Sequence, residues 1–386
     1  MANRIYILSG GSGAGKTVLL NAMLSNNPKS AVTPPKYSDR KKRNPNDDIN
    51  TITLDDFNNG AYTFVYSMNN NIYGFKATEI IECLEKGKNV FVIVSDLRII
   101  EEFKKYFGSL VLVIYIFRNM SEEELNEILE ARESDNNRDI LKDTESKIRK
   151  NRLYLIQRQY VENIALFDHV ILNRTNKQEE MYKQLQNVVA AYSDPEKPII
   201  PHSKGPVIFL IAAASGAGKR TLMHAMYTLG QRSIKVISKS TDRDAQDDDG
   251  REIIPNSTID EEFDIHYEFN SNKYGIKSRE IWSNLANGYP QIVITNMDEF
   301  KQFTEIFGNL AIGVYLHATR TENEIFELQK RKLNNEEKAK KKVEKMEEIH
   351  KGYIKDIAKF KHVLLNTIEK EDLWEQMFRL IKYYRE

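Results

Sequence analysis

The sequence predicts an α/β fold in two tandem domains, and three observations support this prediction. Short apolar runs, such as residues 5–8 and 90–94, alternate with helical patterns such as residues 78–84. This alternation is typical of a mostly parallel sheet that is covered by helices on both faces. A glycine-rich run follows the first apolar run directly, and the same order of features returns about two hundred residues later. Such a return indicates an internal duplication.

The first glycine-rich run, residues 10–17, reads GGSGAGKT and matches the phosphate-binding pattern G-x-x-x-x-G-K-[ST] in full. Glycines let successive backbone N–H groups point at phosphate oxygens, and the following helix adds its positive end. We expect Lys16 to reach the β- and γ-phosphates of ATP and the Thr17 hydroxyl to help hold Mg²⁺. The predicted cofactor-binding residues are Gly10, Ser12, Gly13, Ala14, Gly15, Lys16 and Thr17.

The second glycine-rich run, residues 213–220, reads AASGAGKR. It lacks the first glycine, and Arg220 stands where the Mg²⁺-binding hydroxyl belongs. Gly216, Gly218 and Lys219 remain as candidates for holding phosphate. A glycine-rich turn that binds no nucleotide is an equally good interpretation of this run.

The composition excludes several classes of protein. Among 386 residues, Lys and Arg number 56 and Asp and Glu number 56, so no net field favours nucleic acid or membrane. Cys83 is the only cysteine, which excludes a disulfide framework and a cysteine-based metal site. No apolar run approaches the ~20 residues of a membrane span, and the N-terminus enters a strand instead of a signal peptide. We therefore predict a cytoplasmic protein that does not associate with membranes.

The duplication extends well beyond the glycine-rich runs. Asn71-Ile72-Tyr73-Gly74 returns as Asn272-Lys273-Tyr274-Gly275, and further matches pair residues 106–110 with 306–310 and 168–173 with 361–366. Three prolines lie in the stretch between the copies, as expected of a semi-rigid linker. We predict domains at residues 1–192 and 205–386, joined by a linker at 193–204.

The order of these features resembles the guanylate kinase family of P-loop nucleoside monophosphate kinases, over almost all of each half. The resemblance implies two tandem P-loop NTPase domains, each a mostly parallel sheet flanked by helices, with a lid and an acceptor-binding subdomain. The first half carries it in the glycine-rich loop, the Arg-rich segment 38–43, Tyr73-Gly74, Asp96, the lid arginines Arg132, Arg149 and Arg152, and Leu172-Asn173.

The Arg-rich segment is the candidate acceptor site. Arg40 and Arg43 lie three apart on a loop, and their guanidinium groups match phosphate oxygens bidentately. Tyr73 can add its hydroxyl to the same phosphate. A solvated charge run formed by Lys36 and residues 40–43 is the alternative.

The remaining catalytic candidates also have two interpretations each. Arg132, with Arg149 or Arg152, would close over the transferring phosphoryl group, with surface salt bridges as the alternative. Asp96 ends an apolar strand, where an acid can order Mg²⁺ or merely cap the next helix. Together with Lys16, these residues form the predicted catalytic set.

Both halves depart from the family at the positions that recognise guanine. Counting back from Tyr73 places Phe64 or Val65 at the family's acidic position, and counting back from Tyr274 places Ile265 there. The two residues after each Tyr-Gly are an apolar residue and a lysine, so the sequence does not identify the base of the acceptor nucleotide. The second half keeps Arg243 and Tyr274 as acceptor candidates but has Asn296 in place of Asp96 and a lysine-rich lid run at 338–345.

The leading hypothesis is ATP-dependent phosphoryl transfer to a nucleoside monophosphate by residues 1–192. The resemblance implies GMP or dGMP as the acceptor, with the second half a pseudokinase or regulatory domain. The alternative is a guanylate kinase-like binding module that recognises a phosphorylated protein or senses a nucleotide without catalysis. A nucleic-acid ligand that spans both clefts is a third hypothesis, and the oligomeric state is left open.

Overall fold

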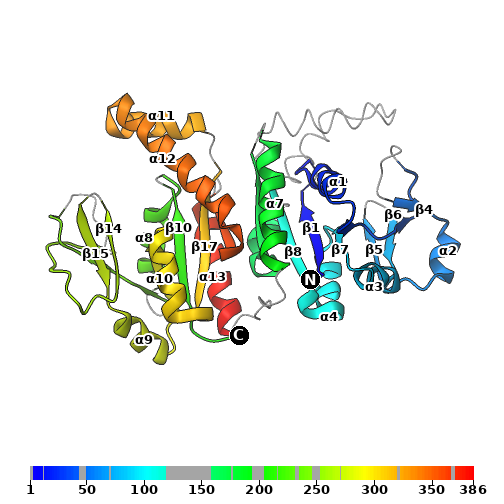
Figure 1. The fold of residues 1–386 in the computed structure, drawn as a ribbon, viewed down its shortest axis with the longest axis horizontal. Helices are drawn as coiled ribbons and strands as arrows, with labels where there is room; N and C mark the ends of the chain where they lie inside the picture. The colour runs from blue at the N-terminus through cyan, green and yellow to red at the C-terminus, as the bar shows by residue number, and fades with distance from the viewer. Residues whose placement is uncertain are drawn as a thin grey trace. The chain divides into compact units, whose positions relative to one another are not determined.

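The computed structural model divides the chain into two compact units (Figure 1). The first unit contains Met1–Gln157 and Leu166–Ile199, and the second contains Arg158–Ala165 and Ile200–Glu386. The residues that the structure describes are 3–11, 13–42, 49–68, 71–118, 158–174, 177–193, 204–214, 216–230, 234–245, 253–269, 271–319, 322–366 and 370–386.

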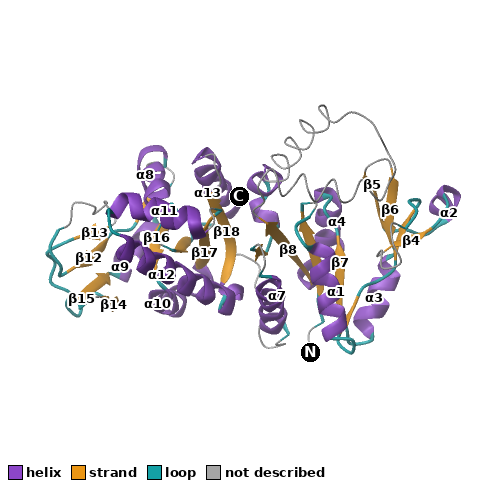
Figure 2. Cartoon of the chain, turned by 90° about the horizontal axis from the view of Figure 1, so that it is seen from above, coloured by secondary structure: helices purple, strands orange, loops and turns teal. Residues whose placement is uncertain are grey.

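A five-stranded parallel sheet forms the centre of the first unit. Its strands, in spatial order, are β2 (Ala31–Val32), β7 (Asn89–Ile93), β1 (Ile5–Gly10), β8 (Val111–Arg118) and β9 (His169–Asn173). The strands are apolar almost throughout because helices cover both faces of the sheet (Figure 2). The flanking helices are α1 (Lys16–Asn26), α3 (Ala77–Glu85), α4 (Leu97–Phe107) and α7 (Gln178–Tyr192). The α/β prediction is confirmed.

A smaller mixed sheet in the first unit carries the segments predicted to bind an acceptor. Its strands, in order, are β4 (Ile49–Thr51), β3 (Lys36–Ser38), β6 (Asn71–Phe75) and β5 (Phe64–Met68). The hairpin of β5 and β6 pairs Phe64 with Phe75 and Tyr66 with Tyr73. Short helix α2 (Leu54–Asn59) begins at a capping box between Thr53 and Asp56.

The small sheet packs on α4 through an aromatic cluster. The ring of Phe64 stacks on that of Phe103 at 4.0 Å between centroids, and Phe75 meets the same ring edge-on. Helix α4 buries Ile99, Ile100 and Phe103 on one face, as the spacing of its apolar residues requires. This packing fixes the position of β5 and β6.

The second unit repeats both strand orders. Its parallel sheet runs β11 (Lys235–Val236), β16 (Gln291–Thr295), β10 (Ile208–Ala213), β17 (Ala311–Ala318) and β18 (Phe360–Asn366). Its small sheet runs β13 (Ile253–Ile254), β12 (Lys239–Thr241), β15 (Asn272–Ile276) and β14 (Ile265–Phe269). Its helices are α8 (Lys219–Leu229), α9 (Ser278–Ala286), α10 (Met297–Phe307), α11 (Glu322–Leu333), α12 (Glu336–Lys355) and α13 (Lys370–Arg385).

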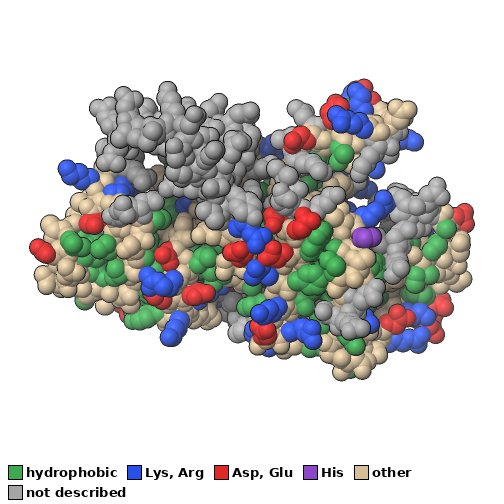
Figure 3. Space-filling view, turned by 180° about the vertical axis from the view of Figure 1, so that it is seen from behind, with side chains coloured by type: hydrophobic (Ala, Val, Ile, Leu, Met, Phe, Trp, Pro, Cys, Tyr) green, Lys and Arg blue, Asp and Glu red, His purple; other side chains and the backbone are tan. Residues whose placement is uncertain are grey.

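The surface carries charges of both signs. Figure 3 shows Lys and Arg side chains interspersed with Asp and Glu on the face that it displays, in keeping with the equal totals in the sequence. Within the part of the chain that the structure describes, no helix combines the length and the apolar character needed to cross a bilayer.

A buried glutamine ties a helix to the edge strand of each parallel sheet. Gln184 on α7 accepts a hydrogen bond from the Leu172 N–H at 2.9 Å and donates one to the Leu172 carbonyl at 3.0 Å. Gln376 on α13 makes the same two bonds with Leu365 of β18. An edge strand otherwise presents backbone groups without a strand partner, so each glutamine completes its sheet.

Replacing Gln184 by leucine should lower the free energy of unfolding of the first unit by about 1–3 kcal/mol, because both backbone groups of Leu172 lose their partner inside the core. Urea unfolding followed by circular dichroism measures the shift. Gln178→Leu, at the exposed start of the same helix, is the matched control. Equal midpoints for the two variants would contradict the role given to Gln184.

Candidate functional site

The loop of residues 10–17 leaves the carboxyl end of β1 and enters α1 along a path that needs glycine. At Gly10, φ is +138°, and a Cβ there would lie 2.5 Å from the Ile116 carbonyl oxygen of β8. At Gly15, φ is +100°, and a Cβ would lie 2.8 Å from the Asn173 amide nitrogen. Both positions are therefore closed to other residues.

Side chains from three elements hold this loop. The Lys16 amine, at the start of α1, donates hydrogen bonds to the Gly10 and Gly11 carbonyls, each at 2.7 Å. Asn173, at the end of β9, donates to the Ala14 carbonyl at 2.7 Å. Arg118, at the end of β8, donates to the Gly13 carbonyl at 3.3 Å. The lysine and the loop thus form one structural unit at the carboxyl edge of the sheet.

Arg118 was not singled out by sequence reasoning. Its signal was available, since it is the one basic residue at the end of the long apolar run 111–118. A basic side chain at the carboxyl end of a parallel strand lies where ligands bind in open α/β sheets.

The two predicted metal ligands lie at different kinds of position. Thr17 is exposed in the first turn of α1. Asp96 is the N-cap of α4, and its carboxylate accepts a hydrogen bond from the Ile99 N–H at 3.1 Å. The structure thus shows the capping contact, while the Mg²⁺ role of Asp96 stays a prediction.

These donors suit Mg²⁺, which proteins commonly hold through one or two oxygen ligands together with substrate phosphates and water. Across the described residues, no three His, Cys, Asp or Glu side chains are grouped so as to hold a metal by themselves.

The acceptor candidates Arg40 and Tyr73 lie together. The Arg40 Nε donates to the Tyr73 hydroxyl at 3.1 Å, and the Ser38 hydroxyl accepts from the Arg40 backbone N–H. The Tyr73 ring stacks on Tyr66 across the hairpin, with centroids 5.3 Å apart. A guanidinium and a phenol are therefore presented side by side at the end of the small sheet.

Lys36 is buried, not part of a solvated charge run. It is 8% exposed, and its amine donates to the Ile93 carbonyl of β7 at 3.2 Å while lying 5.3 Å from the Tyr73 ring centroid. The alternation along β3 turns this side chain inward, a signal that the surrounding lysines and arginines hide in the sequence. Lys36 therefore lies beside Tyr73, one of the predicted acceptor residues.

The strand register decides between Phe64 and Val65 as the inward position. Phe64 is 2% exposed and stacks on Phe103, whereas Val65 is 40% exposed. Lys76, two residues after Gly74, lies over the rings of Tyr37 and Tyr62, at about 5 Å from each. Phe64 is thus the inward-facing residue of this pair.

The second unit reproduces the loop geometry. Gly216 and Gly218 have φ of +83° and +108°, and the Lys219 amine donates to the Ala213 and Ala214 carbonyls, each at 2.9 Å. Asn366, at the end of β18, donates to the Ala217 carbonyl at 2.8 Å, as Asn173 does to Ala14. The loss of the first glycine has not changed the course of this loop.

The acceptor end of the second unit differs in its charges. Arg243 donates through Nε to the Tyr274 hydroxyl at 3.1 Å, which matches the Arg40–Tyr73 pair. Lys239, the counterpart of Lys36, forms an ion pair with Glu299 at 2.6 Å, and both side chains are buried. The carboxylate of Glu299 also accepts a hydrogen bond from the Asn296 N–H at the N-terminus of α10.

Burial changes the acid–base behaviour of Lys219. Loss of hydration lowers the pKa of its amine to about 8, and the positive charge of Lys239 acts in the same direction. The phosphate-loop lysine of the second unit is therefore only partly protonated slightly above neutral pH.

Comparison with known proteins now adds to this geometry. The guanylate kinase family model matches residues 2–192. These residues form a guanylate kinase family domain. A crystal structure of guanylate kinase from Anaplasma phagocytophilum is 18% identical, covering 51% of this chain and 90% of that one, with a TM-score of 0.37. No curated protein matches the chain.

The resemblance drawn from the sequence is thus confirmed for the guanylate kinase domain, and the identity of the second copy stays a prediction. Some predicted residues lie outside the part that the structure describes: Ser12, Arg43, Arg132, Arg149, Arg152 and most of the linker.

The lowered pKa of Lys219 predicts its reactivity. A neutral amine acylates and a protonated one does not, so labelling of Lys219 by acetic anhydride should rise with pH around 8. Mass spectrometry of the intact chain, digested after labelling, measures the midpoint. Labelling of the exposed Lys301 in the same digest serves as the internal reference for reagent reactivity. A Lys219 labelling profile that follows the Lys301 profile would contradict the lowered pKa of Lys219.

Proposed function

We propose that residues 1–192 catalyse ATP-dependent transfer of a phosphoryl group to a nucleoside monophosphate. The observation that carries this proposal is the convergence of a complete phosphate loop and an Arg–Tyr pair on the end of one strand. The Ser95 hydroxyl, just beyond β7, donates to the Gly10 carbonyl, while Lys36 reaches from beside Tyr73 to the Ile93 carbonyl. Donor and acceptor groups therefore border the same edge of the sheet.

The residues divide the work between two phosphate sites. Lys16 and the loop N–H groups would hold the β- and γ-phosphates of ATP. Arg40 and Tyr73 would hold the monophosphate so that one of its oxygens attacks the γ-phosphorus in line, and the ADP oxygen leaves. Mg²⁺ bound through Thr17 would neutralise negative charge on these phosphates. Arg132, with Arg149 or Arg152, would cover the transferring group, as the family resemblance implies.

The acceptor base is the part of the proposal that departs from the family. Phe64 packs against Phe103 at the position where a carboxylate would bind the donor groups of guanine. An apolar surface distinguishes ligands by volume and shape, and it does not leave buried polar groups unpaired with the wrong base. We therefore expect a kinase with little selectivity among bases.

The second unit suits binding better than transfer. Arg220 stands where the first unit has Thr17, and the buried ion pair Lys239–Glu299 stands where the first unit has Lys36 and Ile99. Arg243 and Tyr274 nevertheless keep the geometry of a phosphate clamp. We propose a non-catalytic domain here, and recognition of a phosphorylated partner or nucleotide is the second candidate function.

The substitution Lys16→Ala should lower the rate of phosphoryl transfer by about 10²–10³, because a preorganised charge at the transferring group is lost. A coupled assay of ADP release, with ATP, Mg²⁺ and each monophosphate in turn, measures the rate. Lys105→Ala, on the exposed side of α4, is the control and should retain full activity. Transfer that survives in Lys16→Ala would rule out the first domain as its source.

A panel of GMP, AMP, CMP and UMP, with their deoxy forms, should give kcat/KM values within about 200-fold of one another. A preference above about 10⁴-fold for one base would reveal a polar reading group and contradict the interpretation of Phe64. Binding of ATP without transfer to any monophosphate would instead favour the binding module.

A further inference from the structure

Eight residues of the guanylate kinase domain belong in space to the second unit. The family match runs through residues 2–192, yet Arg158–Ala165 group with Ile200–Glu386. The chain before and after this segment, Met1–Gln157 and Leu166–Ile199, groups with the first unit. We call Arg158–Ala165 the inserted segment.

An arginine ties the inserted segment to two carboxylates on α13. One terminal nitrogen of Arg158 lies 3.1 Å from Asp372 and 2.9 Å from Glu375, and the other lies 3.3 Å from the second Glu375 oxygen. Asp372 and Glu375 are three residues apart and so share one face of the helix. The fork of the guanidinium matches this arrangement, which a lysine could not do.

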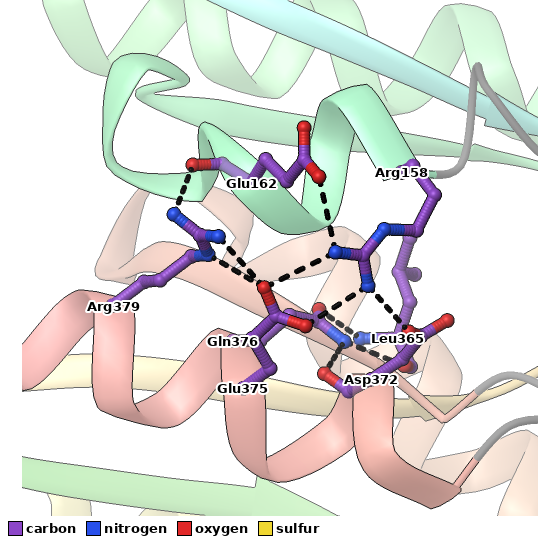
Figure 4. Close-up of polar contacts among 7 residues, drawn as sticks. All are labelled: Arg158, Glu162, Leu365, Asp372, Glu375, Gln376 and Arg379. Carbon is purple, nitrogen blue, oxygen red and sulfur yellow. Dashed lines mark hydrogen bonds and ion pairs between the residues drawn. The ribbon is translucent and has the colours of Figure 1, made fainter.

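A second arginine completes the network (Figure 4). Arg379, one turn beyond Glu375, donates to the Glu375 carboxylate at 2.7 and 3.0 Å and to the backbone carbonyl of Glu162 at 3.2 Å. Partial burial tends to raise the pKa of Glu375, but hydrogen bonds from Arg158 and Arg379 outweigh it and hold this pKa below its ordinary value. Glu375 is therefore a fully charged anchor at neutral pH.

Apolar burial accompanies the ion pairs. Tyr160, Val161 and Ile164 are each about 1% exposed. The Tyr160 hydroxyl donates to the Val363 carbonyl of β18 at 2.6 Å, and this contact is buried. Because β18 is the edge of its sheet, Tyr160 satisfies a backbone group that has no strand beside it.

We infer that α13 and β18 of the second unit form a docking site whose occupant is the inserted segment, and that holding this segment is a function of the second half. The site combines a charged fork, a buried hydroxyl contact and apolar burial, which is the anatomy of a stable interface. The inference does not depend on the phosphotransferase proposal, since none of these residues belongs to the phosphate sites. The second half thereby acts as a structural partner of the first.

The test uses the full chain with a protease site inserted between residues 194 and 203, cleaved after folding. The two fragments should remain associated, and sedimentation velocity over a dilution series gives their dissociation constant. Arg158→Ala should raise this constant about tenfold or more, because Asp372 loses its ion pair with Arg158 and Glu375 keeps only Arg379. Arg98→Ala is the matched control and should leave the constant unchanged, because it removes an exposed ion pair with Glu102 and a hydrogen bond to the Val65 carbonyl, both within the first unit.

Tyr160→Phe keeps the test decisive if Arg158→Ala fails to fold, because it removes a single hydroxyl from the same site. It should also weaken association, by a smaller factor than Arg158→Ala. Fragments that separate at micromolar concentration in the unsubstituted protein would overturn the inference. Association that is equally tight in the unsubstituted protein, Arg158→Ala and Tyr160→Phe would overturn it as well.

Discussion

The passage of the backbone past β8 at Gly10 is the constraint on which the candidate site depends. The loop can turn from β1 into α1 only because Gly10 and Gly15 adopt positive φ angles in contact with Ile116 and Asn173. This turn directs Lys16 back to the loop carbonyls and starts α1 with its N-terminus at the phosphate position. Strands β8 and β9 then stabilise the loop through Arg118 and Asn173, so the geometry of the loop depends on the parallel order of the sheet.

The second unit shows that this scaffold can be kept while its chemistry changes. Both loops and both Arg–Tyr pairs have matching hydrogen bonds, yet the second unit has a buried carboxylate at Glu299 where the first has Ile99. A buried ion pair costs desolvation that its attraction only repays with good geometry. The contact at 2.6 Å and the bond from Asn296 provide that geometry.

Much of the fold and part of the site could be predicted from local patterns. The α/β class follows from alternating runs, and the position of the phosphate loop follows from a pattern that requires glycine for steric reasons. The choice between Phe64 and Val65 required the register of β5 with β6, since a shift of one residue exchanges the two faces of a strand. The burial of Lys36 could not be predicted for a similar reason. Only the pairing of β3 with its neighbours decides which side chains of the charged run point into the core. The inserted segment could not be predicted, because its partners are separated from it by more than two hundred residues.

That separation also has a consequence for how the protein is made. Arg158 is synthesised 214 residues before Asp372, and ribosomes add about 5–20 residues per second, so roughly 10–40 s pass before the partner exists. During this interval Arg158 and Tyr160 have emerged without Asp372, Glu375 and Val363, to which they bond in the folded chain. The inserted segment therefore reaches its final contacts only after the second half has been translated.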